Sequence, residues 1–308
     1  MNALSSEQNI SKRKNDDTLF IPWRRWVRIP WWFVAIVILW IYVVISISSS
    51  PDYRRIYDEL DDGIGLTIYL AVVSYLIALV IGLIVGLIRA YPPRILDHGA
   101  GWKRHLVSVL HTLVYNAATF YVEFMRGIPA LVFLLIAGFI IVPALRGVIN
   151  SEILPLLRSL LNNPEIPDLV WRGRDEGTAI AGLSLIYGAF LAEVFRAGIV
   201  SVPKGQVEAA RSLGMTYLQT MRLIVVPQAI RTILPPLGND FVAMIKDTSL
   251  VTILGTNEIT QLARKWSGSS FQYLETYLVL SLIYLTMTVT GSILVQTMER
   301  RLKRHERR

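Results

Sequence analysis

Long apolar runs alternate with short polar segments along most of this chain. A run of about 20 apolar residues is long enough to cross a bilayer as a helix. Transmembrane barrels would instead show short strands of alternating polarity. The pattern therefore predicts an all-α integral membrane protein with about six transmembrane helices, and residues 106–127 form a helical segment that leads into the third. The predicted spans cover residues 31–47, 65–90, 128–145, 178–200, 229–254 and 273–298.

Composition supports the membrane class and narrows the chemistry. Hydrophobic residues make up 53% of the 308 positions, charged residues only 18%, and the mean hydropathy is +0.46. There is no cysteine, which excludes disulfides and thiolate metal sites. The four histidines lack metal-ligand spacing, so we expect no metal site.

The net charge of +8 is distributed in a way that indicates topology. On the six-span arrangement, 21 Lys and Arg residues fall on one side and 8 on the other. The positive-inside rule then places both termini and residues 201–228 in the cytoplasm. Residues 146–176, which are polar with scattered prolines, are expected to form a loop on the other side. Because the basic residues flank apolar runs, we expect membrane lipid and no nucleic acid as a partner.

Two predicted spans contain helix-breaking residues. One interruption lies at Gly127 and Pro129, and the other at Pro235, Pro236 and Gly238. Irregular backbone at membrane depth is tolerated where it is buried in protein or lines a water-filled cavity. Paired interruptions of this kind indicate a transport pathway.

Another feature of the second span is the pair Gly82 and Gly86. Small residues four apart allow two helices to approach closely. The alternative is chance spacing in an apolar run that contains glycine.

Ionisable residues within spans usually face a cavity or a partner, because they cost about 2.5–3.5 kcal/mol each to insert. Arg126 could present a planar fork to a solute carboxylate, and Glu193 could meet an ammonium. The alternative is that Arg126 and Glu193 pair with each other or with other buried charges. Tyr187, Asn239 and Ser249 could add hydrogen bonds or serve only in packing. The candidate pathway residues are Glu123, Arg126, Tyr187, Glu193, Asn239, Asp247 and Ser249.

The cytoplasmic segment 201–228 carries helix-capping signals. Ser201 is expected to cap a first short helix that has Pro203 near its opening turn. Gly214 is expected to end that helix. Thr216 and Gln219 have the spacing of a capping box for a second helix.

The first of these helices has the features of a docking element. Ala209 and Ala210 leave one face with little side-chain bulk, so that another protein could approach the backbone closely, and Glu208 and Arg211 flank this face. A helix lying on the membrane surface would need Trp, Phe and Leu on one face and Lys on the other. The sequence has neither feature here, which favours a helix that inserts into a partner's groove.

The stretch Glu208-Ala209-Ala210, with Gly214, Ile224 and Pro227 at fixed distances after it, resembles the signature loop of binding-protein-dependent ABC importer permeases. Other stretches are similar to segments of the polar amino acid permeases of histidine, glutamine and arginine type. They are Tyr121 to Pro129, Ala192 to Gly198, Ser201 to Gln206, Leu234 to Asn239 and Lys246 to Leu250.

The resemblance implies the transmembrane domain of a type I ABC importer with a cytoplasmic coupling helix. It places Glu208, Ala209, Ala210, Arg211 and Gly214 against a separate ATPase subunit. We then divide the chain into residues 1–64 (a cytoplasmic tail and an extra first span), 65–297 (the transmembrane domain) and 298–308 (a basic cytoplasmic tail).

The expected function is that of a permease subunit that carries polar amino acids across a bacterial inner membrane. The alternative is another small polar solute, such as an opine or an organic cation. Partners implied are two ATPase subunits, an extracytoplasmic solute-binding protein, and a second permease copy or a homologous permease. No GxxxxGK[ST] loop occurs, so we expect ATP and Mg to be bound by the ATPase and no cofactor by this chain.

Two other classes fit less well. A membrane enzyme would need His, Asp or Ser groups with catalytic spacing, and none appears. A channel without energy coupling would have no use for a docking loop.

Overall fold

The computed structural model describes residues 31–93 and 102–304, which form helices and connecting segments, with no strand among them. The chain divides into two units, residues 1–54 and 55–308, which we treat separately. The first unit contains α3 (Trp31–Ser49), an apolar helix at the predicted first span, and the beginning of α4 (Pro51–Asp61). The predicted tail over residues 1–30 and the last four residues lie outside the described residues.

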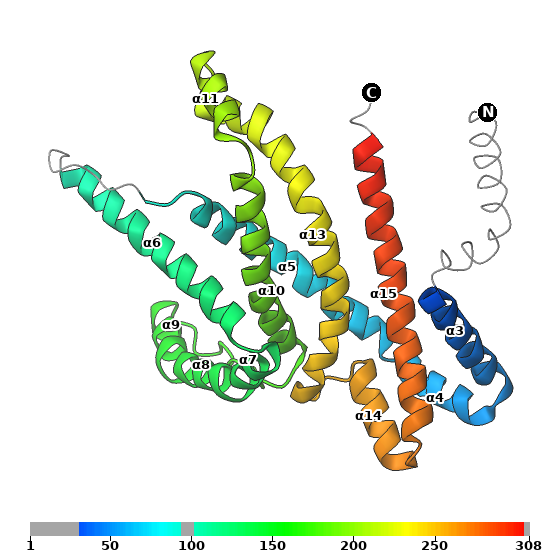
Figure 1. Cartoon of the computed structure of the whole chain (residues 1–308). Helices are drawn as coiled ribbons and strands as arrows, with labels where there is room; N and C mark the ends of the chain where they lie inside the picture. The colour runs from blue at the N-terminus through cyan, green and yellow to red at the C-terminus, as the bar shows by residue number, and fades with distance from the viewer. Residues whose placement is uncertain (1–30, 94–101, 305–308) are drawn as a thin grey trace, which may run out of the picture. The chain divides into compact units, whose positions relative to one another are not determined.

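The second unit is a bundle of long helices joined by short helical elements (Figure 1). The last helix, α15, extends the sixth predicted span into the basic tail. In chain order after α4, the elements are α5 (Ile64–Ala90), α6 (Trp102–Gly127), α7 (Ala130–Ile136), η1 (Ala137–Ile141), α8 (Val142–Val148), η2 (Ile149–Ile153), α9 (Leu154–Leu160), α10 (Glu176–Val200), α11 (Lys204–Ser212), α12 (Tyr217–Thr220), η3 (Met221–Val225), α13 (Val226–Asp247), η4 (Thr248–Leu254), α14 (Ile259–Ser270) and α15 (Tyr273–Arg304).

Four described helical stretches are long and apolar enough to cross a membrane. They are Pro51–Ala90, Ala130–Leu160, Glu176–Val200 and Tyr273–Glu299. Each contains or overlaps a predicted span. The apolar helix Val34–Ser49 is shorter, and α13 is not among the four, so the count of six stays a prediction.

The prediction of a loop over residues 146–176 is wrong in its first half. Helix continues from Ala130 to Leu160, and only residues 161–175 form a loop. Pro143 and Pro155 each follow a π-helical turn and occupy the opening turn of the next helix. A proline there lacks only an N–H that the new helix does not need, so the chain stays helical where isolated prolines suggested a loop.

One of the two expected helix breaks is present. α6 ends at Gly127, and Pro129 is the N-cap of α7, as predicted. The second break is absent, because α13 continues through Pro235 and Pro236. Gly238, two residues after Pro236, lies at a close contact between α13 and α15, because a Cβ there would collide with the Val295 side chain.

Helix α10 is the centre of the bundle, packed against α5, α6 and α13. A Cβ on Gly82 would lie 2.6 Å from Leu191 Cβ, and one on Gly86 would lie 2.7 Å from the Ala192 carbonyl oxygen. The two glycines of α5 therefore mark a close helix contact, and the chance interpretation is wrong. Leu191 and Ala192 are fully buried at this contact.

The ends of α10 connect the two functional regions described below. At its start, the Asp175 side chain accepts hydrogen bonds from the backbone N–H and the hydroxyl of Thr178. Burial opposes ionisation of Asp175, but these hydrogen bonds prevail and hold the pKa of the carboxyl below its usual value. At its other end, α10 leads through residues 201–203 into α11. A helix of 25 residues is about 37 Å long.

Candidate functional site

The loop that resembles a docking element is closed by a specific hydrogen-bond motif. Gly214 follows α11 with φ of +77°. Its N–H donates to the Arg211 carbonyl at 3.0 Å, and the Met215 N–H donates to the Ala210 carbonyl at 3.2 Å. This pair of bonds is the Schellman motif, which requires the left-handed backbone that glycine adopts without strain. The predicted role of Gly214 in ending the helix is confirmed.

The start of the second short helix also follows the prediction. The Thr216 hydroxyl accepts a hydrogen bond from the Gln219 N–H, and the Gln219 side chain accepts one from the Thr216 N–H. The predicted cap of the first helix is wrong, however. Ser201 is the C-cap of α10, with its hydroxyl on the Gly198 carbonyl, and Pro203 is the N-cap of α11. α10 ends at Val200, the predicted end of the fourth span, and Ser201 therefore closes α10 rather than opening α11.

The two alanines of α11 face different surroundings. Ala210 is buried at 4% exposure, whereas Ala209 is exposed. The expectation of one smooth face made by both alanines is therefore wrong, because Ala210 packs inside its own chain. The exposed surface of α11 and its cap includes Glu208, Ala209, Arg211 and Leu213, the last at 83% exposure.

A buried arginine ties three helices together near the end of α10 that leads to this loop. Arg89 of α5 donates to Glu193 of α10 and to Glu123 of α6, each at 3.1 Å. Its side chain is only 10% exposed, against 63% for Glu123. Arg196 also binds Glu193 through Nε at 2.9 Å. The two arginines and two glutamates thus form one ion-paired network across α5, α6 and α10.

Arg126 lies beside this network. One interpretation of the sequence paired Arg126 with Glu193, and the structure contains no such ion pair among the described residues. The Arg126 guanidinium lies over the ring of Phe190, 5.8 Å from the centroid. Phe190 contacts the ring of Tyr187 at 6.2 Å, and the Tyr187 hydroxyl donates to Asp247 at 2.8 Å. The structure therefore brings Arg126, Tyr187 and Asp247 into one chain of contacts across α6, α10 and α13.

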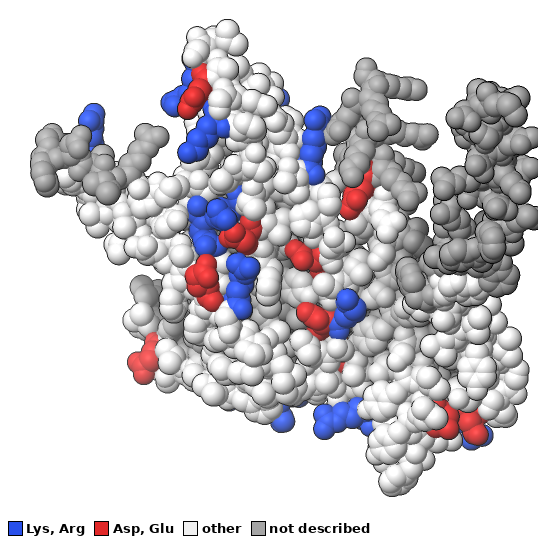
Figure 2. Space-filling model, in the orientation of Figure 1, with Lys and Arg blue, Asp and Glu red and all other residues white. Residues whose placement is uncertain are grey.

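Two other candidate pathway residues, Asn239 and Ser249, make fewer side-chain contacts. The structure gives the Asn239 and Ser249 side chains no hydrogen bond within the described residues, and Asn239 is exposed. Arg126 is also exposed. Figure 2 shows acidic and basic side chains gathered in the middle of one face, surrounded mostly by uncharged residues. Exposed charge at membrane depth needs a cavity or a partner.

Arg89 was missed as a site residue by reasoning from the sequence. It was counted only among the basic residues that set topology. Its position inside the predicted span 65–90, in the last turn of a helix that ends at Ala90 rather than in a polar loop, was the available signal. Its two acidic partners come from segments 34 and 104 residues away along the chain, so only tertiary structure connects them.

We expect the stability of the fold to depend more on the carboxylates around Arg89 than on Arg89 itself. The double variant Glu123→Gln with Glu193→Gln leaves a buried cation without a counterion, which costs about 3–5 kcal/mol when burial is complete. Arg89→Met removes the charge instead, and Glu193 keeps Arg196. The double variant should lower the midpoint of thermal unfolding in detergent more than Arg89→Met does. The exposed Arg222 provides a control, since Arg222→Met should leave the midpoint unchanged; the reverse order of the first two variants would contradict the role of the network.

Comparison with known proteins places this helical bundle and its capped loop in a class of transporter subunits. Residues 106–304 match the family described as binding-protein-dependent transport system inner membrane component, and the chain belongs to that family. The match covers α6 to α15, including the loop around Gly214. The chain is therefore a multi-pass membrane permease subunit of an ABC importer.

Similar proteins with assigned names are permeases of Bacillus subtilis and Rhizobium meliloti. The probable amino-acid permease YxeN is 36% identical over 65% of this chain and 78% of its own length. The probable glutamine ABC transporter permease GlnM is 35% identical over 64% and 82%. The octopine transport permease OccM of Rhizobium meliloti is 35% identical over 59% and 68%.

Solved structures agree with this fold. The crystal structure of an amino acid ABC transporter with histidines matches with a TM-score of 0.58 at 30% identity, over 79% of this chain and 94% of the other. An inward-facing MetNI methionine transporter matches with a TM-score of 0.55 at 19% identity, over 79% of this chain and 96% of the other, which supports the fold alone.

Proposed function

We propose that this chain imports polar amino acids across the inner membrane of a bacterium, using ATP hydrolysed by a separate subunit. The observation that carries the proposal is the short helix α11, closed at Gly214 by a Schellman motif and exposed on the side of Glu208, Ala209 and Arg211. A rigid, exposed helical element of this kind is suited to a partner's groove. We assign the docking role to Glu208, Ala209, Arg211 and Gly214, while Ala210 supports the helix from within.

Leu213 extends this docking surface. Its side chain is 83% exposed, directly before Gly214. Tyr217 and Leu218 of α12 are also exposed, at 58% and 75%. Large apolar side chains grouped on one exposed surface mark an interaction site. The ATPase subunit would cover these side chains, and ATP with Mg would bind to that subunit.

Two permease copies, or one copy with a homologous partner, would form the pathway. Glu123, Arg126 and Asn239 are exposed in the single chain, although they belong to or adjoin membrane-spanning helices. A second subunit would enclose these groups in a cavity between the two chains. Arg126 is placed to bind a solute carboxylate, and the Tyr187–Asp247 pair is placed to accept from an ammonium group.

The substrate class follows from relatives that are named as amino-acid and glutamine permeases. A zwitterion needs both donors and acceptors, and the contact chain from Arg126 to Asp247 offers both. An opine is the second candidate, because the octopine permease OccM is similar over 184 residues. Positive-inside counting supports cytoplasmic termini and a cytoplasmic α11.

Reconstitution with partner subunits tests the proposal. The permease is co-expressed and purified with a candidate ATPase subunit from the same organism and placed in lipid nanodiscs. Addition of the solute-binding protein loaded with glutamine, arginine or octopine in turn should raise ATP hydrolysis for one class of solute. Failure of the permease to co-purify with an ATPase subunit, or hydrolysis by the permease alone, would contradict the proposal.

A further inference from the structure

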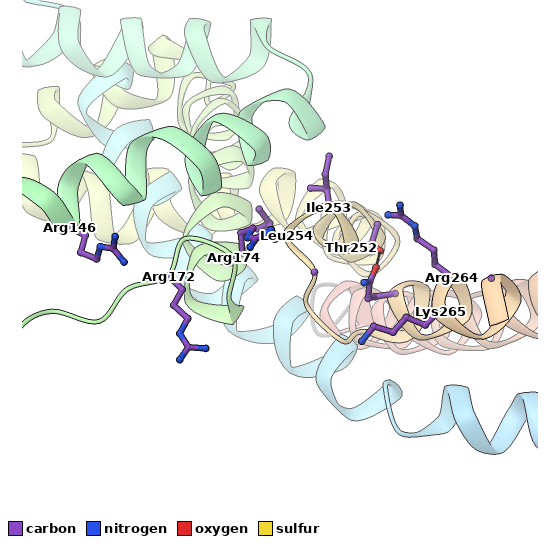
Figure 3. Close-up of a pocket in the computed structure, with 11 residues that line it drawn as sticks. Arg146, Arg172, Arg174, Thr252, Ile253, Leu254, Arg264 and Lys265 are labelled. Carbon is purple, nitrogen blue, oxygen red and sulfur yellow. Dashed lines mark hydrogen bonds between the residues drawn. The ribbon is translucent and has the colours of Figure 1, made fainter.

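A wide pocket opens at the end of the bundle opposite α11. It has a volume of about 880 Å³ and lies between α8, the segment before α10, η4 and α14. Figure 3 shows Arg146, Arg172 and Arg174 on one side of it, and Arg264 and Lys265 on the other. We call this the outer basic pocket.

The outer basic pocket carries a concentrated positive charge. Five of its lining residues are cationic and none is acidic. None of the five forms an ion pair within the described residues. Arg174 is held over the Phe139 ring at 5.6 Å, and Lys265 donates to the Asn257 side chain. The side chains of Arg172 and Arg264 make no described hydrogen bond. Like charges at this density repel one another unless an anionic partner compensates them.

Two acidic residues line a cavity beside the outer basic pocket. A neighbouring cavity of about 460 Å³ shares Gly255 with the pocket and carries Asp175 and Glu176. The Asp175 carboxylate caps α10 through Thr178. Glu176 forms no ion pair with the pocket cations among the described residues. Within the described residues the five cations of the outer basic pocket therefore have no acidic ion-pair partner, which leaves their charge available to an anionic partner.

The pocket lies on the side from which solute arrives. Arg172 and Arg174 immediately precede α10, and α11 follows its other end, about 37 Å away. Figure 1 shows α14 and α11 at opposite ends of α10. With α11 cytoplasmic, the pocket is extracytoplasmic.

We propose that the outer basic pocket docks an acidic protrusion of the extracytoplasmic solute-binding protein. This inference rests on the proposed function and adds to it the surface and the charge of the partner. All five cations are exposed and spread over the rim of an open pocket. A site for a small anion would instead hold it with buried, converging donors. A rim of exposed charges steers a charged macromolecule and fixes its orientation.

The test compares charge variants in nanodiscs that hold the permease with its ATPase subunit. Arg172→Glu combined with Arg264→Glu reverses one charge on each side of the pocket without removing a described hydrogen bond. The concentration of loaded binding protein that gives half-maximal ATPase stimulation should rise by roughly tenfold or more. Basal hydrolysis and the maximal stimulated rate should be unchanged. Raising ionic strength should weaken stimulation of the unmodified complex much more than that of the variant.

Matched variants isolate the charge. Arg172→Lys combined with Arg264→Lys keeps both charges and should retain the original half-maximal concentration. If the glutamate variant kept the original half-maximal concentration and salt dependence, the docking role of the pocket would be wrong. The proposed function would stand in that case, because the loaded binding protein would still stimulate ATP hydrolysis.

Two further outcomes would also overturn the inference. If the glutamate variant altered uptake only for anionic solutes, with unchanged affinity for the binding protein, the pocket would be a solute funnel. If the unmodified complex showed no stimulation by any loaded binding protein, the proposed function itself would fail, and the docking inference with it.

Discussion

Replacing Gly214 by valine is expected to abolish solute-stimulated ATP hydrolysis and uptake while leaving the permease in the membrane. A β-branched side chain at φ of +77° is strained by about 1–3 kcal/mol. The strain falls on the two hydrogen bonds that close α11, from Gly214 and Met215 to the helix carbonyls. The loop would then leave the conformation in which, on our proposal, α11 contacts the ATPase. The measurement is ATPase stimulation by loaded binding protein in reconstituted nanodiscs, with binding of that protein followed separately.

Gly205 provides the matched control. Gly205 lies in α11, the helix that ends just before Gly214, and a Cβ at either glycine meets no atom within 4 Å. The difference between Gly205→Val and Gly214→Val is therefore backbone conformation rather than space. Gly205→Val should not lower helix stability, because valine is a better helix former than glycine, and it should retain coupling. Normal stimulation in Gly214→Val would remove the docking role from this loop.

Arg126→Ala is expected to eliminate uptake without loss of assembly. The guanidinium is exposed and rests on the Phe190 ring, and the structure gives it no ion pair whose loss would destabilise the fold. Removing it takes away the donor that we assign to the solute carboxylate, a charge-assisted contact worth about 1.5–3 kcal/mol. Uptake of radiolabelled glutamine into proteoliposomes measures the effect, and co-purification with the ATPase subunit measures assembly.

The charge and the geometry of Arg126 can be separated. Arg126→Lys keeps the cation but loses the planar fork, so uptake should fall to an intermediate level. Arg104, exposed near the other end of the same helix, is the control, and Arg104→Ala should behave as the unmodified protein. Full uptake in Arg126→Ala would exclude this residue from the pathway.

Predictions from helix-capping residues were confirmed where the hydrogen bonds join residues that are close in sequence. The capping box of Thr216 and Gln219 and the helix end at Gly214 involve residues within five positions of one another, so spacing alone predicts them. Prolines were the main source of error. The residues around Pro143 and Pro155 stay helical through π-helical turns, and α13, which packs against α10 and α15, continues through Pro235 and Pro236.

By itself, the sequence determined the all-helical membrane class, the spans that are long and apolar, the break at Pro129 and the closure of the loop at Gly214. These properties follow from hydrophobic length and short-range hydrogen bonds. Only the tertiary structure decided that Ala210 is buried, that Arg89 rather than Arg126 pairs with Glu193, and that five cations surround one outer pocket. Each of these results depends on which helix faces lie together. Contacts between helices distant along the chain fix those faces, and hydrophobic periodicity in a single span does not specify them.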